Sequence, residues 1–349
     1  MICRRSEYTP WSFVLRIKSM LIALVIVVSS INACTSAPDC VRKEIFCAAL
    51  VTDIKGLDDF GMNHATWDGL TQSKADGVVD QIAYIESVDK RDYEKNITFF
   101  VNAGYDVIIT SGAGIQAATL RSADLYPDSV FIGMNQTDDK SIPNFIAVTF
   151  PEDQMGFYAG ALAAHLTSTH IIGAVCEDSS IVAMWRYCEG FRAGAKYTDA
   201  SVTILTIYHD NASRENLFVD AAWGSENAQT LIHRGADVLF AVGGDTSAGA
   251  LRAATQAKIK SIGAERDQGA ALGEEGKSVV TSILGRANFT VQNLMRRVKS
   301  GDLSDAGSSP IEYIPYEANV PKNIVTVLDG VLAGLSNGSI KTNVILQKP

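Results

Sequence analysis

Three carboxylates and an amide lie close together in the chain, directly after a strongly apolar run. Asp53 ends that run, Asp58 and Asp59 follow in a glycine-containing loop, and Asn63 begins a segment with helical spacing of apolar residues. Carboxylates accept hydrogen bonds and an amide both donates and accepts, so these side chains suit a ligand with hydroxyl or amine groups. The alternative is a strand-to-helix loop whose acids cap the helix and are hydrated.

A second candidate loop, Thr110–Ala117, matches the G-x-G-x-x-A pattern of dinucleotide-binding proteins. The pattern follows the third expected strand rather than the first, and the next strand ends in Asn135, where the ribose-binding pattern has an acid. We therefore favour a loop in which Ser111 and Gly112 offer groups to a small ligand over a nicotinamide site. A tight turn that only opens a helix is the alternative.

An alternation of strands and helices must position these loops. The order predicts α/β architecture, with parallel sheets covered by helices on both faces. The expected strands are Ile45–Thr52, Asp80–Tyr84, Val107–Thr110, Val130–Met134, Phe145–Thr149, Ile171–Cys176, Thr203–Ile207, Val238–Ala241, Ser261–Ala264 and Ser278–Leu284. The expected helices are Asn63–Gln72, Asp92–Ala103, Gln116–Ala123, Met155–Leu166, Val182–Tyr197, Ala221–His233, Ser247–Ala257, Val291–Lys299 and Lys322–Leu335.

The two series of strands predict two lobes, since 349 residues exceed the usual size of one domain. We expect an N-terminal lobe of residues 45–149 plus about 279–318, and a C-terminal lobe of residues 150–278 plus about 319–349. Two or three chain crossings between the lobes would form a hinge that closes on a ligand.

Composition excludes several classes of function. A net charge of −9 and a pI of about 5.1 argue against a nucleic-acid partner. HExxH and Walker motifs are missing from the sequence, and its five histidines show no ligand pairing. We therefore expect no catalytic residue, no metal site and no cofactor.

Residues 1–33 have the features of a targeting segment. Arg16 and Lys18 precede an apolar run, Met20–Val28, that is too short for a comfortable membrane span. The following Ile31–Cys34 resembles a bacterial lipobox, which predicts a diacylglycerol anchor on Cys34 and a tether over residues 34–44. The alternative is a plain secretory signal in which Cys34 is incidental.

Four further cysteines would enter an exported compartment, where disulfides are possible. None has CxxC or metal-type spacing, and Cys47 and Cys188 fall inside an expected strand and helix. Buried free thiols are slightly favoured for Cys40, Cys47, Cys176 and Cys188. If a bridge forms, Cys176–Cys188 is the favoured pair.

The stretches Val51–Asp53, Gly56–Asp59 and Asn63–Leu70 resemble the opening signature of the basic membrane protein (BMP) family, the substrate-binding lipoproteins of nucleoside ABC importers. The resemblance implies a type I periplasmic-binding fold, with two doubly wound parallel-sheet lobes joined by a hinge. It places Asp53, Asp59 and Asn63 at the ligand. The family has a Phe that stacks on the nucleobase where this chain has Met62.

The same resemblance assigns later residues. Asn135 takes the place of an acid that reads a purine edge, although a simple turn residue would also fit there. Trp223 would stack on the base or, alternatively, fill the core. The remaining contacts are a backbone approach at Gly243 and Gly244, ribose hydroxyls at Glu265, and a positive charge at Arg286 in place of a family Lys that is Gly285 here.

The sequence thus predicts a binding protein that captures a nucleoside and delivers it to an ABC permease from a lipid anchor on the outer side of the membrane. The resemblance implies a purine nucleoside. A receptor for a sugar or another polar small molecule on the same fold is the alternative. An enzyme that binds a nucleotide cofactor at the Gly112–Gly114 loop is a third hypothesis.

Overall fold

The computed structural model describes residues 40–137, 141–213, 215–304, 307–316 and 320–349. The expected signal segment and Cys34 lie outside the described residues, so their roles stay predictions. Within the described part, every helix is too short or too polar to cross a membrane.

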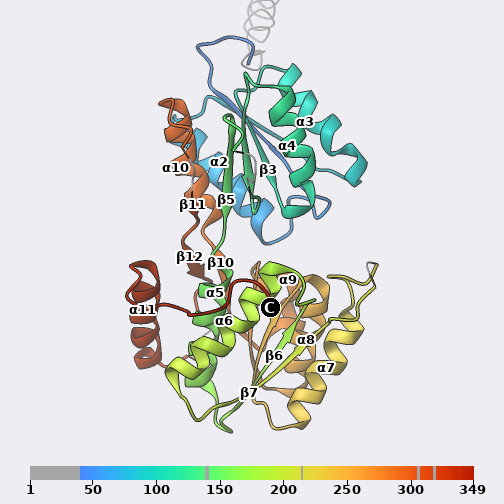
Figure 1. The fold of residues 1–349 in the computed structure, drawn as a ribbon, viewed down its shortest axis with the longest axis vertical. Helices are drawn as coiled ribbons and strands as arrows, with labels where there is room; N and C mark the ends of the chain where they lie inside the picture. The colour runs from blue at the N-terminus through green and yellow to red at the C-terminus, as the bar shows by residue number, and fades with distance from the viewer. Residues whose placement is uncertain (1–39, 138–140, 214, 305–306, 317–319) are drawn as a thin grey trace, which may run out of the picture. The chain divides into compact units, whose positions relative to one another are not determined.

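The first sheet has six strands in the order β11-β5-β4-β3-β1-β2, and all of its pairs are parallel (Figure 1). Residues of β1 and β3 are completely buried, which explains the apolar runs Ala48–Val51 and Val107–Ile109. The strands are β1 (Cys47–Val51), β2 (Gln81–Ile85), β3 (Val107–Ser111), β4 (Val130–Met134), β5 (Phe145–Thr149) and β11 (Gly307–Ser308).

Helices cover both faces of this sheet. Leu50 packs in one apolar cluster with residues of α2 (Met62–Ala75) and α10 (Ala287–Lys299). Its neighbour Val51 packs in another cluster with residues of α3 (Tyr93–Asn102) and α4 (Gln116–Leu125). Short 3-10 turns precede α3 and α4, namely η2 (Lys90–Asp92) and η3 (Ala113–Ile115).

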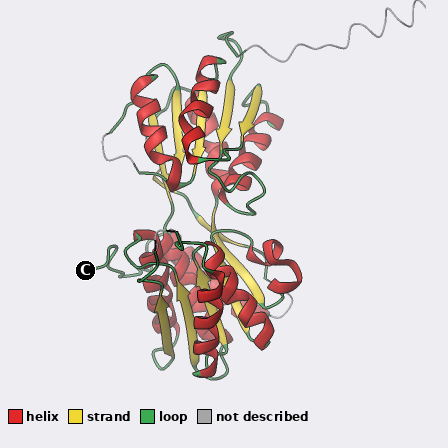
Figure 2. Cartoon of the chain, turned by 90° about the vertical axis from the view of Figure 1, so that its right-hand side faces the viewer, coloured by secondary structure: helices red, strands yellow, loops and turns green. Residues whose placement is uncertain are grey.

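The second sheet has the order β12-β10-β9-β8-β6-β7, with β12 antiparallel to β10 and the other pairs parallel. Its strands are β6 (Ile171–Cys176), β7 (Thr203–Tyr208), β8 (Val238–Val242), β9 (Lys260–Ala264), β10 (Val279–Gly285) and β12 (Ile311–Tyr313). Figure 2 shows the strands of each sheet enclosed by helices.

Successive residues of β6 face different helices. Ala174 lies in the cluster of α5 (Glu152–Leu166) and α6 (Val182–Thr198), and Val175 lies in that of α7 (Ala221–His233) and α8 (Gly244–Ala257). The shorter elements α9 (Gln268–Leu272) and η4 (Gly273–Gly276) follow β9, and α11 (Lys322–Ser336) contacts α5.

Glycines let α5 and α6 approach closely. A Cβ on Gly156 or Gly160 would overlap the carbonyl oxygens of Tyr187 or Phe191. A Cβ on Gly194 would likewise overlap the backbone of α5. These glycines therefore allow close helix–helix packing.

One expected boundary is wrong. Residues 279–318 were assigned as a block to the first lobe, but β10 pairs with β9 and β12 of the second sheet. An apolar strand buried on both faces suits either sheet, so the sequence pattern could not assign it. The following α10 does pack against α2 of the first lobe.

The chain passes between the sheets after β5, after β10 and between β11 and β12. Hydrogen bonds join these segments, because Ser309 N donates to Thr149 O and Arg286 N donates to Pro310 O, each at 2.8 Å. Phe150 packs so closely on Gly285 that a Cβ there would overlap its ring. The three passages therefore form one connected hinge.

Two disulfides lie within the described residues. Cys176–Cys188 joins β6 to α6, as expected if any bridge formed, and Cys40–Cys47 ties the chain before β1 to that strand. The favoured expectation of free thiols is therefore wrong. Cys47 is fully buried in β1, and nothing in the sequence indicated that Cys40, before that strand, is its partner.

Candidate functional site

The loops at the carboxyl end of the first sheet bring four predicted residues together. Asn63 donates from Nδ2 to Asp53 Oδ1 at 2.9 Å and to Gly56 O at 2.8 Å. Gly112 has φ +102°, a conformation that favours glycine, and a Cβ on it would lie 2.9 Å from Asp53 Oδ2. Ser111, the preceding residue, ends β3.

Two polar atoms in this group are buried and have no hydrogen-bond partner among the described residues. They are Asn63 Oδ1 and Ser111 Oγ, on residues that are 2% and 0% exposed. An unsatisfied buried polar atom costs about 1–3 kcal/mol. Such atoms at the carboxyl end of parallel strands lie where ligands bind in open α/β sheets.

Asp59 and Met62 have structural contacts. The Asp59 carboxylate accepts from the backbone N–H groups of Gly61, Asn63 and His64 at 2.8–3.1 Å, so it caps the start of α2 as the alternative for this loop proposed. Met62 is partly buried against the core. Phe60, which was not among the predicted residues, is 47% exposed and has a φ of +52°.

The end of β4 is held by Gln136 rather than by Asn135. Gln136 Nε2 donates to Thr110 Oγ1 at 3.0 Å and to Gly112 O at 3.1 Å. Asn135 is half-buried with φ +57°, a left-handed conformation that Asn tolerates. Gln136 thus links two loops of the first sheet edge, and it was not among the predicted residues.

At the carboxyl end of the second sheet, Glu265 contacts both predicted glycines. Its Oε2 accepts from Gly243 N at 3.1 Å and from Gly244 N at 3.3 Å, at the start of α8. A carboxylate there is favoured by the partial positive charge of the helix N-terminus. Gly243 has φ +117°, and a Cβ on it would lie 2.5 Å from Glu177 Cβ.

A buried polar cluster, whose residues were not predicted from the sequence, lies beside these glycines. Glu177, fully buried, accepts from Thr246 Oγ1 at 2.7 Å and Phe218 N at 2.8 Å, and lies 2.9 Å from His209 Nδ1. His209 stacks on Trp223 with ring centroids 4.1 Å apart. One face of the Trp223 indole is therefore already covered by an imidazole.

Arg286 lies at the hinge. Its Nε is 3.3 Å from Glu312 Oε2, and its guanidinium lies over the Phe289 ring at 4.6 Å. Burial of Glu312 raises the pKa of that carboxyl, and the nearby Arg286 opposes the rise. Arg286 therefore joins β12 to the start of α10, and the structure does not bring it into either group of loop residues described above.

The two sheet edges make direct contact through their loops. Asp267 N, after β9, donates to Phe60 O, after β1, at 2.8 Å. The neighbouring Gly61 is so close to Arg266 that a Cβ would lie 2.9 Å from Arg266 Cβ. The predicted residues thus form two polar groups, one on each sheet, whose loops touch at Phe60 and Asp267.

A family comparison matches most of this chain. The model of the Bmp family, described as ABC transporter substrate-binding protein PnrA-like, matches residues 46–309. The chain belongs to the Bmp family.

Relatives and solved structures agree with this assignment. A CD4+ T-cell-stimulating antigen of Listeria monocytogenes is 27% identical over 93% of this chain and 98% of that protein. The ABC transporter nucleoside-binding protein BmpA of Lactococcus lactis is 27% identical over 73% of this chain and 75% of its own length. A solute-binding protein of an ABC transporter from Conexibacter woesei has a TM-score of 0.71 at 21% identity, covering 87% of this chain and all of that one, which shows the type I periplasmic-binding fold.

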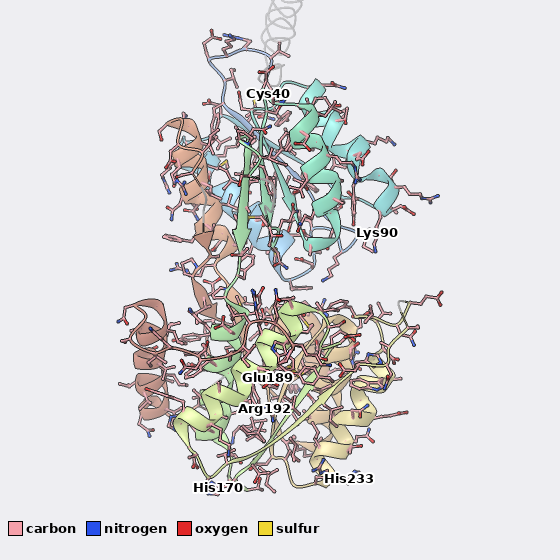
Figure 3. The ribbon with its side chains drawn as sticks, in the orientation of Figure 1. Cys40, Lys90, His170, Glu189, Arg192 and His233 are labelled. Carbon is pink, nitrogen blue, oxygen red and sulfur yellow. A yellow bond between two sulfur atoms is a disulfide. The ribbon has the colours of Figure 1, made fainter. Side chains whose placement is uncertain are left out.

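As a Bmp protein, the chain is an extracytoplasmic substrate-binding protein of an ABC transporter rather than an enzyme. Such proteins bind a small molecule and pair with a permease. In the described part of this Bmp protein, His, Cys, Asp and Glu residues do not gather in any group of three that could hold a metal ion. His170 and His233 lie at the opposite edge of the second sheet from the site (Figure 3).

Proposed function

We propose that this Bmp protein binds a purine nucleoside at the carboxyl ends of its two sheets and delivers it to its permease. One observation carries the proposal: Asp53 and Glu265 lie in the loops that follow β1 and β9, and these loops meet at Phe60 and Asp267. The Lactococcus lactis relative described as nucleoside-binding supports the choice of ligand class.

Each group of residues suits one part of such a ligand. A ribose 2′,3′-diol presents two O–H donors, and Glu265 has a second carboxylate oxygen besides the one that accepts from Gly243 and Gly244. The base would lie at the first sheet, where Asn63 Oδ1 and Ser111 Oγ have no partner in the part of the chain that the structure describes. Asn135 would read its polar edge, since an amide can donate as well as accept.

A sugar receptor is the second candidate, and the state of the aromatic residues favours it. Met62 offers no ring for stacking, and one face of Trp223 is covered by His209. Phe60, which is 47% exposed, is an aromatic residue at the loop contact. A ligand that needs no stacking would still use the acids and amides.

A thermal-shift panel of inosine, adenosine, uridine, ribose and galactose separates the two candidates. At about 100 times its dissociation constant, a true ligand stabilises the fold by about 2.7 kcal/mol. Stabilisation by inosine, with no effect of ribose, is the expected result. A shift with ribose or galactose and none with any nucleoside would refute the proposed ligand.

The proposal includes lobe closure about the hinge and a diacylglycerol anchor on Cys34. Small-angle scattering with and without a saturating ligand should show a smaller radius of gyration in the complex, and an unchanged radius would count against closure. Intact-mass analysis of membrane fractions from a bacterial host should show a diacylglyceryl mass on Cys34. An unmodified residue at that position would exclude the anchor.

A further inference from the structure

The last residues of the chain follow the carboxyl edge of the second sheet. Beyond α11, Thr342 Oγ1 donates to Asp153 Oδ2 at 2.5 Å, and Ile345 O accepts from Trp185 Nε1 at 2.7 Å. Figure 1 follows this segment from α11 across α5 and α6 toward the end of β6. We call residues Thr342–Lys348 the C-terminal strap.

Lys348 completes the strap by joining two loops of the candidate site. Its Nζ donates to Ser179 Oγ at 2.6 Å and to Asp210 Oδ2 at 3.3 Å. Ser179, after β6, donates from both N and Oγ to Asp210 Oδ1, after β7, at 2.9 and 2.6 Å. The Asp210 carboxylate is therefore held at both oxygens, by one neighbouring loop and by the strap.

These loops carry the buried polar cluster. Ser179 follows Glu177 by two residues, and Asp210 directly follows His209. Glu177 and His209 lie 2.9 Å apart, and His209 covers one face of Trp223. A displacement of Ser179 or Asp210 would therefore also move Glu177 or His209, which are only one or two residues away in the chain.

The contact between Lys348 and Asp210 is partly exposed to solvent, which indicates that it positions the nearby loops rather than stabilising the whole fold. The side chains of Lys348 and Asp210 are 47% and 42% exposed. Ion pairs that exposed contribute little to global stability, usually about 0–1 kcal/mol. Burial raises the pKa of Asp210, but the hydrogen bonds from Ser179 and Lys348 outweigh it and hold that pKa below its ordinary value. The contact is formed, yet the fold as a whole does not depend on it.

We propose that Lys348 is a positioning residue for ligand binding, which holds the loops after β6 and β7 in their binding geometry through Ser179 and Asp210. The inference rests on the proposed binding of a ligand at this edge. It assigns the strap to the site, although no strap residue was expected there from the sequence.

The test compares Lys348→Met with two controls. Lys348→Arg keeps the charge and the donors, and Lys341→Met removes an exposed lysine just before the strap. Hydrogen exchange of the unliganded proteins is followed in peptides covering residues 177–181 and 209–213. Calorimetry then measures the affinity of each variant for inosine.

Lys348→Met should exchange faster at both loops and bind inosine about three- to tenfold more weakly, with an unchanged melting temperature. Lys348→Arg and Lys341→Met should stay within twofold of the wild type. Unchanged exchange, or faster exchange with unchanged affinity, overturns the proposal. If the wild type fails to bind inosine, the proposed ligand is refuted, and unchanged loop exchange in Lys348→Met would then overturn the strap's role separately.

Discussion

Glu265→Gln is the substitution that tests the second-lobe site most directly. Glu265 Oε2 accepts from Gly243 N and Gly244 N at the first turn of α8. Glutamine keeps the length of the side chain, but it removes the negative charge and turns one acceptor into a donor. The change therefore affects both the local fold and any ligand group that Glu265 accepts from.

The two effects have different sizes. Hydrogen bonds to charged groups contribute about 1.5–3 kcal/mol and neutral ones about 0.5–1.5 kcal/mol, so two weakened bonds should lower the free energy of unfolding by about 2 kcal/mol. The loss of one charged contact to a ribose hydroxyl should weaken nucleoside binding by about tenfold, since 1.4 kcal/mol is tenfold.

The assay is calorimetric affinity for inosine and for its 2′,3′-dideoxy analogue, in the wild type and in Glu265→Gln. The wild type should prefer inosine, and the variant should lose most of that preference. If the wild type binds both compounds equally, the diol is not recognised. If Glu265→Gln discriminates as well as the wild type, Glu265 is misassigned, and Asp267, which caps α9 through Ala270 N at 2.9 Å, becomes the next candidate.

Three further predictions concern the scaffold. Gly160→Ala should lower the free energy of unfolding by about 1–3 kcal/mol because the new Cβ would overlap Phe191 O. Gly330→Ala, where a Cβ meets no neighbouring atom within 4 Å, should raise that free energy by about 0.5–1 kcal/mol. Equal shifts in the melting temperatures of the two variants would contradict this prediction. Replacing both Cys176 and Cys188 by Ala opens a loop of 12 residues and should cost about 3 kcal/mol in urea unfolding, and an unchanged midpoint would mean that no bridge forms in solution. Burial raises the pKa of Asp237, but hydrogen bonds from Thr167, Ser168 and Thr169 lower it below its ordinary value. Because a depressed pKa stabilises the fold only above the unfolded value of about 3.9, Asp237→Asn should cost about 1–3 kcal/mol at pH 7, and its difference in melting temperature from the wild type should shrink as the pH falls below about 4.

The strands were predictable because burial on both faces leaves a continuous apolar sequence. Val130–Met134 and Phe145–Thr149 have the same bounds in the sequence prediction and in the structure. An apolar sequence does not indicate to which of two sheets its strand belongs. The prediction therefore assigned β10 to the first lobe, whereas it pairs with β9 of the second sheet. Short elements such as α9 and β12 were missed because they contain too few residues to show a period.

The candidate site was predictable where its residues follow strands, and not where distant side chains meet. Asp53 and Glu265 stand out because each ends an apolar run. Glu177 and His209 are 32 residues apart, so neither local spacing nor residue type indicated their contact. The contact between Arg286 and Glu312 could not be predicted for the same reason, because Arg286 follows β10 and Glu312 lies in β12.

The two sheet edges differ in how fully their polar groups are paired. At the second sheet, Glu177 accepts from several donors, and Glu265 from two backbone N–H groups. At the first sheet, Asn63 Oδ1 and Ser111 Oγ are buried and unpaired among the described residues. Native proteins rarely keep such atoms unless water, an ion or a ligand satisfies them. A ligand that paired them would gain the hydrogen bonds without a further cost of burying those two atoms. This difference favours a division in which the second lobe is organised before binding and the first lobe gains hydrogen bonds only when the ligand arrives.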